Sequence, residues 1–162
     1  MKKKFKHAYI DVAERFSRLS HSQKLKVGAI IVKDNRIISI GYNGMPSGWD
    51  NVCEEPVMED DIYEPKYFYK SKKEVLHAES NAIAKVAKSN ESCDNATLFC
   101  THEPCLECAK LILQSGITAV YYRNAYDSLN YGSGVEFLKQ SDIYVELVDE
   151  DSTNYWYTHR RP

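Results

Sequence analysis

The chain has 162 residues, with 23 acidic and 21 basic side chains, a formal net charge of -2 and a pI near 6.2. This length is enough for one substantial hydrophobic core and short for two, so we expect residues 1–162 to form a single domain with one site per chain. The charge balance lacks the basic excess of proteins that hold long nucleic acids by their phosphates. It therefore favours a small-molecule substrate and no polynucleotide partner.

Signals for export or membrane insertion are not evident in the sequence. The start, MKKKFKHAYIDVAERF, is basic but has no apolar run behind it, and no segment approaches the roughly 18 apolar residues of a membrane span. Five cysteines, an odd number, indicate thiols or metal ligands more than a disulfide framework. We expect a cytoplasmic protein without a membrane partner.

The first part of the chain predicts a helix followed by a hairpin. Residues 4–20 place apolar side chains at helical spacing, which indicates an amphipathic helix packed on a sheet. The β-branched runs 27–33 and 36–42 are separated by Asp-Asn, which predicts two antiparallel strands joined by a tight turn. Residues 43–73 contain three prolines, an acidic run and then a basic run, which predicts a long loop or insertion.

The second part of the chain alternates predicted helices and strands, and ends in a polar tail of uncertain structure. In chain order we expect a helix at 76–87, a strand at 96–101, a helix at 105–116, a strand at 117–123, a helix at 134–140, a strand at 143–148 and the tail at 149–162. Strand-helix-strand units favour parallel neighbours with helices on both faces of the sheet. The predicted fold is a three-layer α/β/α sandwich with a mixed five-stranded sheet.

Two short motifs carry the candidate chemistry. LHAESNAI (76–83) puts His77 and Glu79 two residues apart at the start of a predicted helix, an arrangement that by itself also suits a core histidine and ordinary helix chemistry. THEPCLECAK adds Cys105 and Cys108, which share one face of a helix whose N-terminus favours thiolates. A redox-active cysteine pair is the alternative for that second motif.

Together, His77, Cys105 and Cys108 supply three ligands suited to Zn²⁺, one fewer than closed structural zinc sites use. A fourth position left open can hold water, whose pKa the metal lowers towards neutrality, and Glu79 can then take and return its proton. Cys53, Cys93 and Cys100 lack a matching ligand spacing and are expected to be buried or loop thiols. We therefore expect one catalytic zinc per chain.

Four segments in this order resemble the deoxycytidylate deaminase family of the cytidine deaminase superfamily: VGAIIV (27–32), GYNGMPSG (41–48), HAESNAI (77–83) and THEPCLECAKLI (101–112). The resemblance extends over about residues 5–148. The zinc motifs alone would also admit nucleoside, tRNA, mRNA or pterin-related deaminases. A strand that ends in GYNG-x-P before a long insertion resembles the nucleotide monophosphate branch.

This resemblance implies hydrolytic deamination of dCMP to dUMP and ammonia, which feeds thymidylate synthesis, with Glu79 as the proton-transferring residue. By similarity, Asn43 contacts the deoxyribose or the base edge, since an amide both donates and accepts hydrogen bonds. Lys24 and Arg123 are candidates for the 5′-phosphate, although both could simply be solvated. Pocket walls that stack or gate are expected from Tyr122 or Tyr126.

The resemblance also implies regulation. Many relatives are homohexamers that dCTP activates and dTTP inhibits, with Mg²⁺ accompanying the triphosphate. The expected effector contacts come from the turn after the second strand: Gly41, Tyr42, Asn43, Gly44 and Gly48. Glycines let backbone N–H groups approach phosphates closely, although the same residues also suit an ordinary tight turn. A polynucleotide or nucleoside deaminase and a non-enzymatic zinc module remain the alternatives.

Overall fold

A computed structural model of the chain describes residues 1–59, 66–126 and 134–149. The tail expected at 149–162 lies, apart from Asp149, outside the described residues. Within the described ranges, no helix combines the length and the apolar character needed to cross a lipid bilayer.

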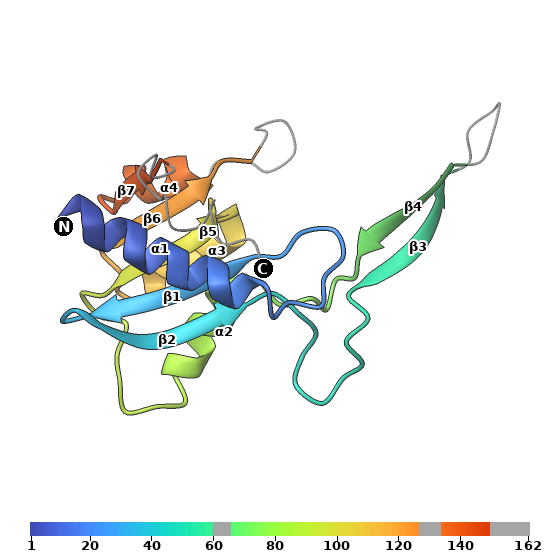
Figure 1. Ribbon diagram of the computed structural model, residues 1–162, viewed down its shortest axis with the longest axis horizontal. Helices are drawn as coiled ribbons and strands as arrows, with labels where there is room; N and C mark the ends of the chain where they lie inside the picture. Colours follow the sequence, from blue (N-terminus) through green and yellow to red (C-terminus); the bar gives the residue numbers. More distant parts are fainter. Residues whose placement is uncertain (60–65, 127–133, 150–162) are drawn as a thin grey trace, which may run out of the picture.

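The centre of the molecule is a five-stranded sheet with the strand order β2-β1-β5-β6-β7 (Figure 1). Its strands are β1 (Gly28–Lys33), β2 (Arg36–Tyr42), β5 (Thr97–His102), β6 (Ala119–Asn124) and β7 (Tyr144–Leu147). β1 runs antiparallel to both β2 and β5, whereas β5, β6 and β7 are parallel to one another. The predicted mixed sheet is confirmed, and its antiparallel part includes the β1–β5 pair as well as the hairpin.

The turn between β1 and β2 follows from its two residues. Asp34 and Asn35 both have positive φ angles, of 50° and 59°. Such a pair gives the two-residue turn whose twist matches that of the flanking strands, and short polar side chains tolerate it. The predicted hairpin at Asp-Asn is therefore present.

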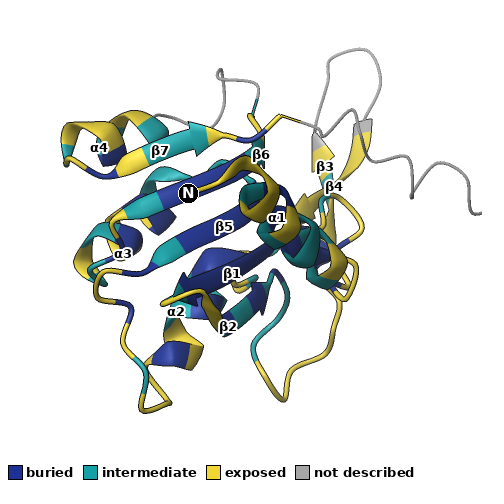
Figure 2. Ribbon diagram, turned by 60° about the vertical axis from the view of Figure 1, so that its left-hand side comes forward, coloured by how far each residue is buried: buried dark blue, intermediate teal, exposed yellow. Residues whose placement is uncertain are grey.

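Helices cover both faces of the sheet, which confirms the predicted three layers (Figure 2). Helix α1 (Lys3–Ser17) packs on one face, over β1 and β5, and buries Ile10 and Ala13 against Phe99 and Tyr121. Helices α2 (Ala78–Val86), α3 (Leu106–Gln114) and α4 (Gly134–Gln140) belong to the other face. Successive residues of a strand point to opposite faces, so each strand of the centre contributes to both cores.

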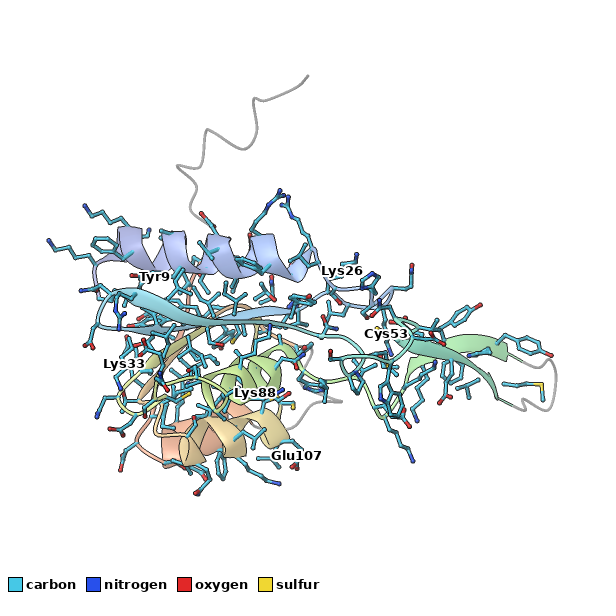
Figure 3. All side chains as sticks on the ribbon, turned by 90° about the horizontal axis from the view of Figure 1, so that it is seen from below. Tyr9, Lys26, Lys33, Cys53, Lys88 and Glu107 are labelled. Atoms are coloured by element: carbon cyan, nitrogen blue, oxygen red, sulfur yellow. The ribbon has the colours of Figure 1, made fainter. Side chains whose placement is uncertain are left out.

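The segment predicted as a long loop contains a hairpin that the periodicity did not reveal. Strands β3 (Glu54–Glu59) and β4 (Lys66–Ser71) pair antiparallel and project away from the sheet (Figures 1 and 3). Aromatic side chains of β4 stay exposed, including Tyr67 at 73% and Tyr69 at 68%. The sequence of β3 reads as loop because its charged residues and its proline are rare in central strands and tolerated in an isolated hairpin.

Candidate active site

The predicted metal ligands lie where two helices begin. His77 is the N-cap residue of α2, and Cys105 is the N-cap residue of α3, just after the C-terminal end of β5. Gly44 and Leu76 form an isolated antiparallel bridge, which fixes the backbone immediately before His77. The N-termini of both helices therefore meet at one site, where their partial positive charges favour thiolates.

The side chains of His77, Cys105 and Cys108 converge, although they come from segments about thirty residues apart. His77 Nδ1 lies 3.5 Å from Cys105 Sγ and 3.4 Å from Cys108 Sγ, and the three ligand atoms all lie within 4.8 Å of one another. Nitrogen and sulfur ligands bound tetrahedrally to one Zn²⁺ stand about 3.5 Å apart. The spacing and the chemistry of this donor set therefore fit a zinc ion, and among the described residues this is the one such group.

Hydrogen bonds within this cluster lower the pKa of one cysteine and raise the pKa of the other cysteine and of the histidine. Cys108 and His77 stabilise the Cys105 thiolate, and the pKa of Cys105 is lowered to about 4. The pKa of Cys108 is raised, first by its hydrogen bond with Cys105 and then by burial. Contact with Cys105 also raises the pKa of His77. A metal ion replaces the protons that these three groups share, because its ligands bind in their deprotonated forms.

Glu79 lies in the first turn of α2, two residues after His77, and its side chain is buried with an exposed fraction of 4%. Burial raises the pKa of Glu79 to about 7. His77, Cys105 and Cys108 all act on its charge, so the carboxyl group lies beside the cluster. A buried carboxyl group next to a three-ligand metal site is suited to proton transfer at that site.

A pocket of about 510 Å³ opens over the cluster, a size within the range of roughly 300–1,000 Å³ that is typical of small-ligand sites. Two of the metal-ligand candidates, His77 and Cys105, line it together with Glu79. The other lining residues come from the loop before β1, the residue after β2, the base of the β3–β4 hairpin, the start of α2 and the segment after β6: Ser22, Lys24, Leu25, Val27, Asn43, Ser71, Lys72, Lys73, Val75, Ala78 and Tyr126.

Asn43 lines this pocket, but its amide group is engaged with the backbone of one wall. Its Oδ1 accepts a hydrogen bond from the Val27 N–H at 2.8 Å, and its Nδ2 donates to the Leu25 carbonyl oxygen at 2.8 Å. An amide has a second lone pair and a second N–H, so further contacts are open to it. Through these two hydrogen bonds, Asn43 holds the backbone of the loop that carries Lys24.

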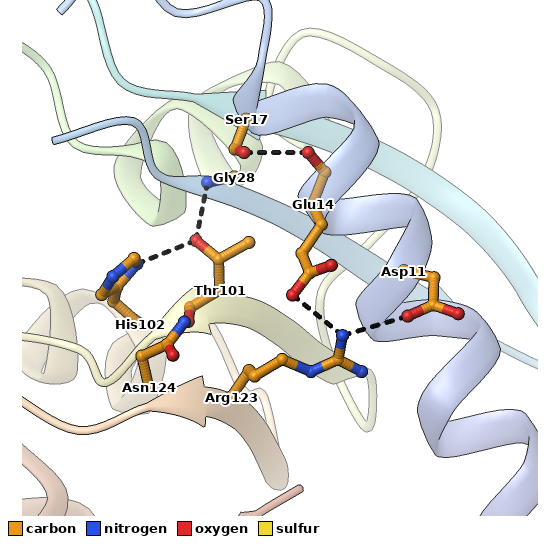
Figure 4. A network of polar contacts seen from close by, with 8 residues as sticks. All are labelled: Asp11, Glu14, Ser17, Gly28, Thr101, His102, Arg123 and Asn124. Atoms are coloured by element: carbon orange, nitrogen blue, oxygen red, sulfur yellow. Dashed lines mark hydrogen bonds and ion pairs between the residues drawn. The ribbon is translucent and has the colours of Figure 1, made fainter. Parts of the chain in front are cut away.

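Arg123 does not reach the pocket, and the prediction that it binds phosphate is corrected. Its Nη1 donates hydrogen bonds to Asp11 Oδ1 at 3.1 Å and to Glu14 Oε1 at 2.8 Å, both on helix α1 (Figure 4). The Arg123 side chain is 10% exposed. Since residues of β6 alternate between faces, Arg123 shares the α1 face with Tyr121 and is turned away from the metal-ligand cluster.

The two tyrosines predicted as pocket walls separate in the structure. Tyr122 is 9% exposed and packs in the core beneath α2 and α3, so it does not line the pocket. Tyr126 does line it and stacks on the His102 ring, with the ring centroids 5.5 Å apart. His102 in turn lies 3.1 Å from Thr101 Oγ1, which accepts a hydrogen bond from the Gly28 N–H (Figure 4).

The glycine turn has structural roles that differ from residue to residue. A Cβ atom on Gly41 would lie 2.0 Å from the Ala78 carbonyl oxygen, so the close approach that this glycine allows is to helix α2, not to a phosphate. Tyr42 accepts a hydrogen bond from Asn81 at its carbonyl oxygen. Gly44 has open space where a Cβ would be, and Gly48 has a φ angle of 89°, which only glycine adopts readily.

Several pocket residues were missed by the sequence interpretation. Lys72 and Lys73 follow β4 directly and line the pocket together with Ser71. Their signal was the basic run KSKK at 70–73, which was included in the presumed loop. Glu54 was read as part of an acidic run, yet it is 7% exposed and hydrogen-bonded to the loop before β1.

Known proteins match this chain in sequence and in structure. The deoxycytidylate deaminase of Enterobacteria phage T4 is 32% identical, with 90% of each chain covered, and that of Mus musculus is 35% identical, with 90% of this chain and 85% of the relative covered. ComE operon protein 2 of Bacillus subtilis is 36% identical over 79% of this chain, which spans 62% of that relative.

Among solved structures, the dCMP deaminase of cyanophage S-TIM5 in complex with dCMP and dUMP is 42% identical. It covers 91% of this chain and 98% of its own, with a TM-score of 0.76. The protein-family model described as the cytidine and deoxycytidylate deaminase zinc-binding region matches residues 2–124 of this chain. With its His-Cys-Cys cluster, its buried glutamate and these matches, the chain belongs to the cytidine and deoxycytidylate deaminase family.

Proposed function

We propose that the protein catalyses the zinc-dependent hydrolytic deamination of dCMP to dUMP and ammonia. The observation that carries this proposal is one pocket lined by two chemically different sets of residues. His77, Cys105 and Glu79 line it, and so do the cations Lys24, Lys72 and Lys73. Such a pocket suits a ligand that has both a reactive ring and an anionic group. The relatives named as dCMP deaminases support the same substrate.

In this proposal His77, Cys105 and Cys108 hold one Zn²⁺ per chain. Bound there, the ion supplies the Lewis acidity that makes water a competent nucleophile near neutral pH. Glu79 takes a proton from the attacking water, delivers one to N3 of the cytosine and passes a proton to the departing ammonia. Its burial beside the metal ligands removes competing water from the carboxyl group.

The remaining pocket residues select the substrate. Asn43 keeps one N–H and one lone pair available for the deoxyribose or the base edge after its two backbone contacts. Lys24 lies where it can attract the 5′-phosphate, and Lys72 and Lys73 add positive charge from the hairpin. Tyr126, stacked on His102, serves as a wall of the pocket.

The test is a steady-state assay of the zinc-loaded protein on dCMP, CMP, dCTP, deoxycytidine and a single-stranded DNA containing cytosine. We expect the highest kcat/KM for dCMP. The DNA arm matters because Tyr67 and Tyr69 are exposed on the hairpin, and exposed aromatic side chains can stack on unpaired bases. Turnover of the DNA but not of dCMP would replace the proposed substrate.

We further propose that the protein is a homohexamer that dCTP activates and dTTP inhibits, with Mg²⁺ accompanying the triphosphate. The similarity of GYNGMPSG to the regulated branch supports this, and the Gly44–Leu76 bridge connects that turn with the residue before His77. Gly44 and Gly48 remain the candidates for contacts between the backbone and phosphate. Hyperbolic dCMP kinetics that neither triphosphate alters, from a protein that sediments as a monomer or dimer, would exclude this regulation.

A further inference from the structure

One carboxylate oxygen of Glu54 collects three hydrogen bonds from the loop before β1. Ser22 Oγ donates to Glu54 Oε1 at 2.7 Å, the Gln23 N–H donates at 2.9 Å and the Lys24 N–H donates at 3.3 Å. Glu54 is the first residue of β3, so these contacts join segments that are 30 to 32 residues apart. A carboxylate that accepts several N–H and O–H bonds holds their donors in one geometry.

Both segments that Glu54 joins are walls of the pocket. Ser22 and Lys24 line it from the loop, and Ser71, the register partner of Glu54 in β4, lines it from the hairpin. Beside this pair the Lys72 N–H donates to the Cys53 carbonyl oxygen at 2.9 Å, so Lys72 is tied to the residue before Glu54. The carboxylate of Glu54 thus holds the loop of Lys24, and the backbone of the adjacent Cys53 holds Lys72, so that both segments are joined at the start of β3.

The carboxylate is suited to this task because it is buried and charged. Glu54 is 7% exposed, although it is the first residue of a projecting hairpin. Burial raises the pKa of Glu54, but the hydrogen bonds from Ser22, Lys24 and Gln23 outweigh that effect, and the pKa lies below its usual range. A buried glutamate whose partners all lie in one loop acts on the position of that loop.

We propose that Glu54 is a positioning residue that sets the distance between Lys24 and the lysines of the hairpin base, Lys72 and Lys73, so that together they form the subsite for the 5′-phosphate of the nucleotide. This inference rests on the proposed function, because it concerns how the same pocket takes a monophosphate. Glu54 itself does not touch the substrate. It acts through the loop that its three hydrogen bonds hold.

The inference predicts a defect that depends on the phosphate. In Glu54→Ala, the loop loses its three hydrogen bonds to the carboxylate, and we expect the KM for dCMP to rise at least about tenfold while kcat stays within about twofold, the pattern of lost uniform binding. The KM for deoxycytidine, which has no phosphate, should change by less than about twofold. A general loss of folding would affect both substrates and kcat together.

Two conservative variants separate geometry from charge. Glu54→Gln keeps an acceptor oxygen at the same reach and is expected to restore the KM for dCMP to within about threefold of the wild-type value. Glu54→Asp keeps the charge but withdraws the carboxylate by one methylene group, so it should resemble Glu54→Ala. Glu55→Ala is the matched control, since Glu55 is the exposed neighbour on the same strand.

The experiment measures kcat and KM for dCMP and deoxycytidine with zinc-loaded wild type and these variants, together with zinc content and thermal unfolding. A wild-type protein without activity on dCMP would overturn the proposed function, whatever Glu54 does. An active wild type with an unchanged dCMP KM in Glu54→Ala and Glu54→Asp would overturn the inference alone. So would an equal rise for both substrates. If Glu54→Ala does not fold, the contrast between the Asp and Gln variants decides.

Discussion

Arg123 of β6 is paired with Glu14 of helix α1 at 2.8 Å, on the face of the sheet opposite the metal-ligand cluster. Asp11, one turn earlier on the helix, lies 3.1 Å from the same guanidinium nitrogen. The arginine is 10% exposed, whereas its two partners are 28% and 35% exposed. The ion pairs therefore fasten α1 to the sheet and contribute nothing to the pocket directly.

Replacing this arginine should affect stability and leave catalysis alone. Arg123→Ala leaves two neighbouring, partly exposed carboxylates without their cation, and we expect the free energy of unfolding to fall by about 2 kcal/mol. The KM for dCMP should stay within about twofold, because the residue lies on the α1 face. Urea unfolding and steady-state kinetics check both parts. The control is Arg36→Ala, whose pair with Glu91 at 3.3 Å is largely exposed and should be worth less than about 1 kcal/mol.

Gly41 supports the site through its contact with helix α2. In Gly41→Ala, the new methyl group meets the Ala78 carbonyl oxygen at 2.0 Å and the Ala82 nitrogen at 2.7 Å, so the helix must move. We expect a loss of about 3 kcal/mol in unfolding free energy, and lower zinc affinity because His77 is the N-cap residue of α2. Gly44→Ala is the matched control for the steric effect, since nothing lies within 4 Å of its added Cβ. Equal melting temperatures for Gly41→Ala and wild type would contradict the packing argument.

Zinc content should depend on the converging ligands and on no other thiol. Cys105→Ala or Cys108→Ala leaves two protein ligands, and we expect the zinc content of the purified protein to fall from about one per chain to near zero. Cys93→Ala is the control, because Cys93 is a buried free thiol outside the cluster. Elemental analysis measures the metal directly. Full zinc occupancy in Cys108→Ala would remove that residue from the ligand set.

Glu79 should be needed for turnover and dispensable for metal binding. Glu79→Gln keeps the size of the buried side chain but cannot take the proton, so we expect kcat to fall by at least roughly 10²-fold. Zinc content and dUMP binding should remain near wild-type values, because neither depends on a proton at this position. Metal analysis, calorimetric titration with dUMP and steady-state kinetics check these expectations. A variant with near-native turnover would exclude Glu79 as the proton-transferring residue.

The loss of folding stability at low pH should depend in part on Glu146. Burial raises the pKa of Glu146, but hydrogen bonds from Lys6 and Tyr144 outweigh this and hold the pKa below its usual value. The stabilising effect is therefore fully present above the unfolded-state pKa of about 4.3, and it is lost as the pH falls through the lower folded-state pKa. Glu146→Gln should lower the melting temperature at pH 7 and differ little from wild type near pH 2. A difference that does not depend on pH would show that the carboxylate charge is irrelevant.

Much of the site could be read from the sequence because its parts are local. Cys105 and Cys108 share a helix face through their spacing of three, and the helix start that favours thiolates is set by the residues around them. His77 and Glu79 are likewise placed by the first turn of α2. The order of helices and strands then predicted the layered sheet, since strand-helix-strand units pack in few ways.

The tertiary structure alone decided which predicted residues face the pocket. Tyr122 and Arg123 are neighbours in sequence, yet alternation along β6 sends one to the core under α2 and α3 and the other to α1. Arg123 pairs with Asp11 across 112 residues, and Glu54 holds its loop across about thirty. Such contacts join segments that only the folded sheet brings together. Periodicity and motif spacing describe residues within a single segment, so they cannot predict these contacts.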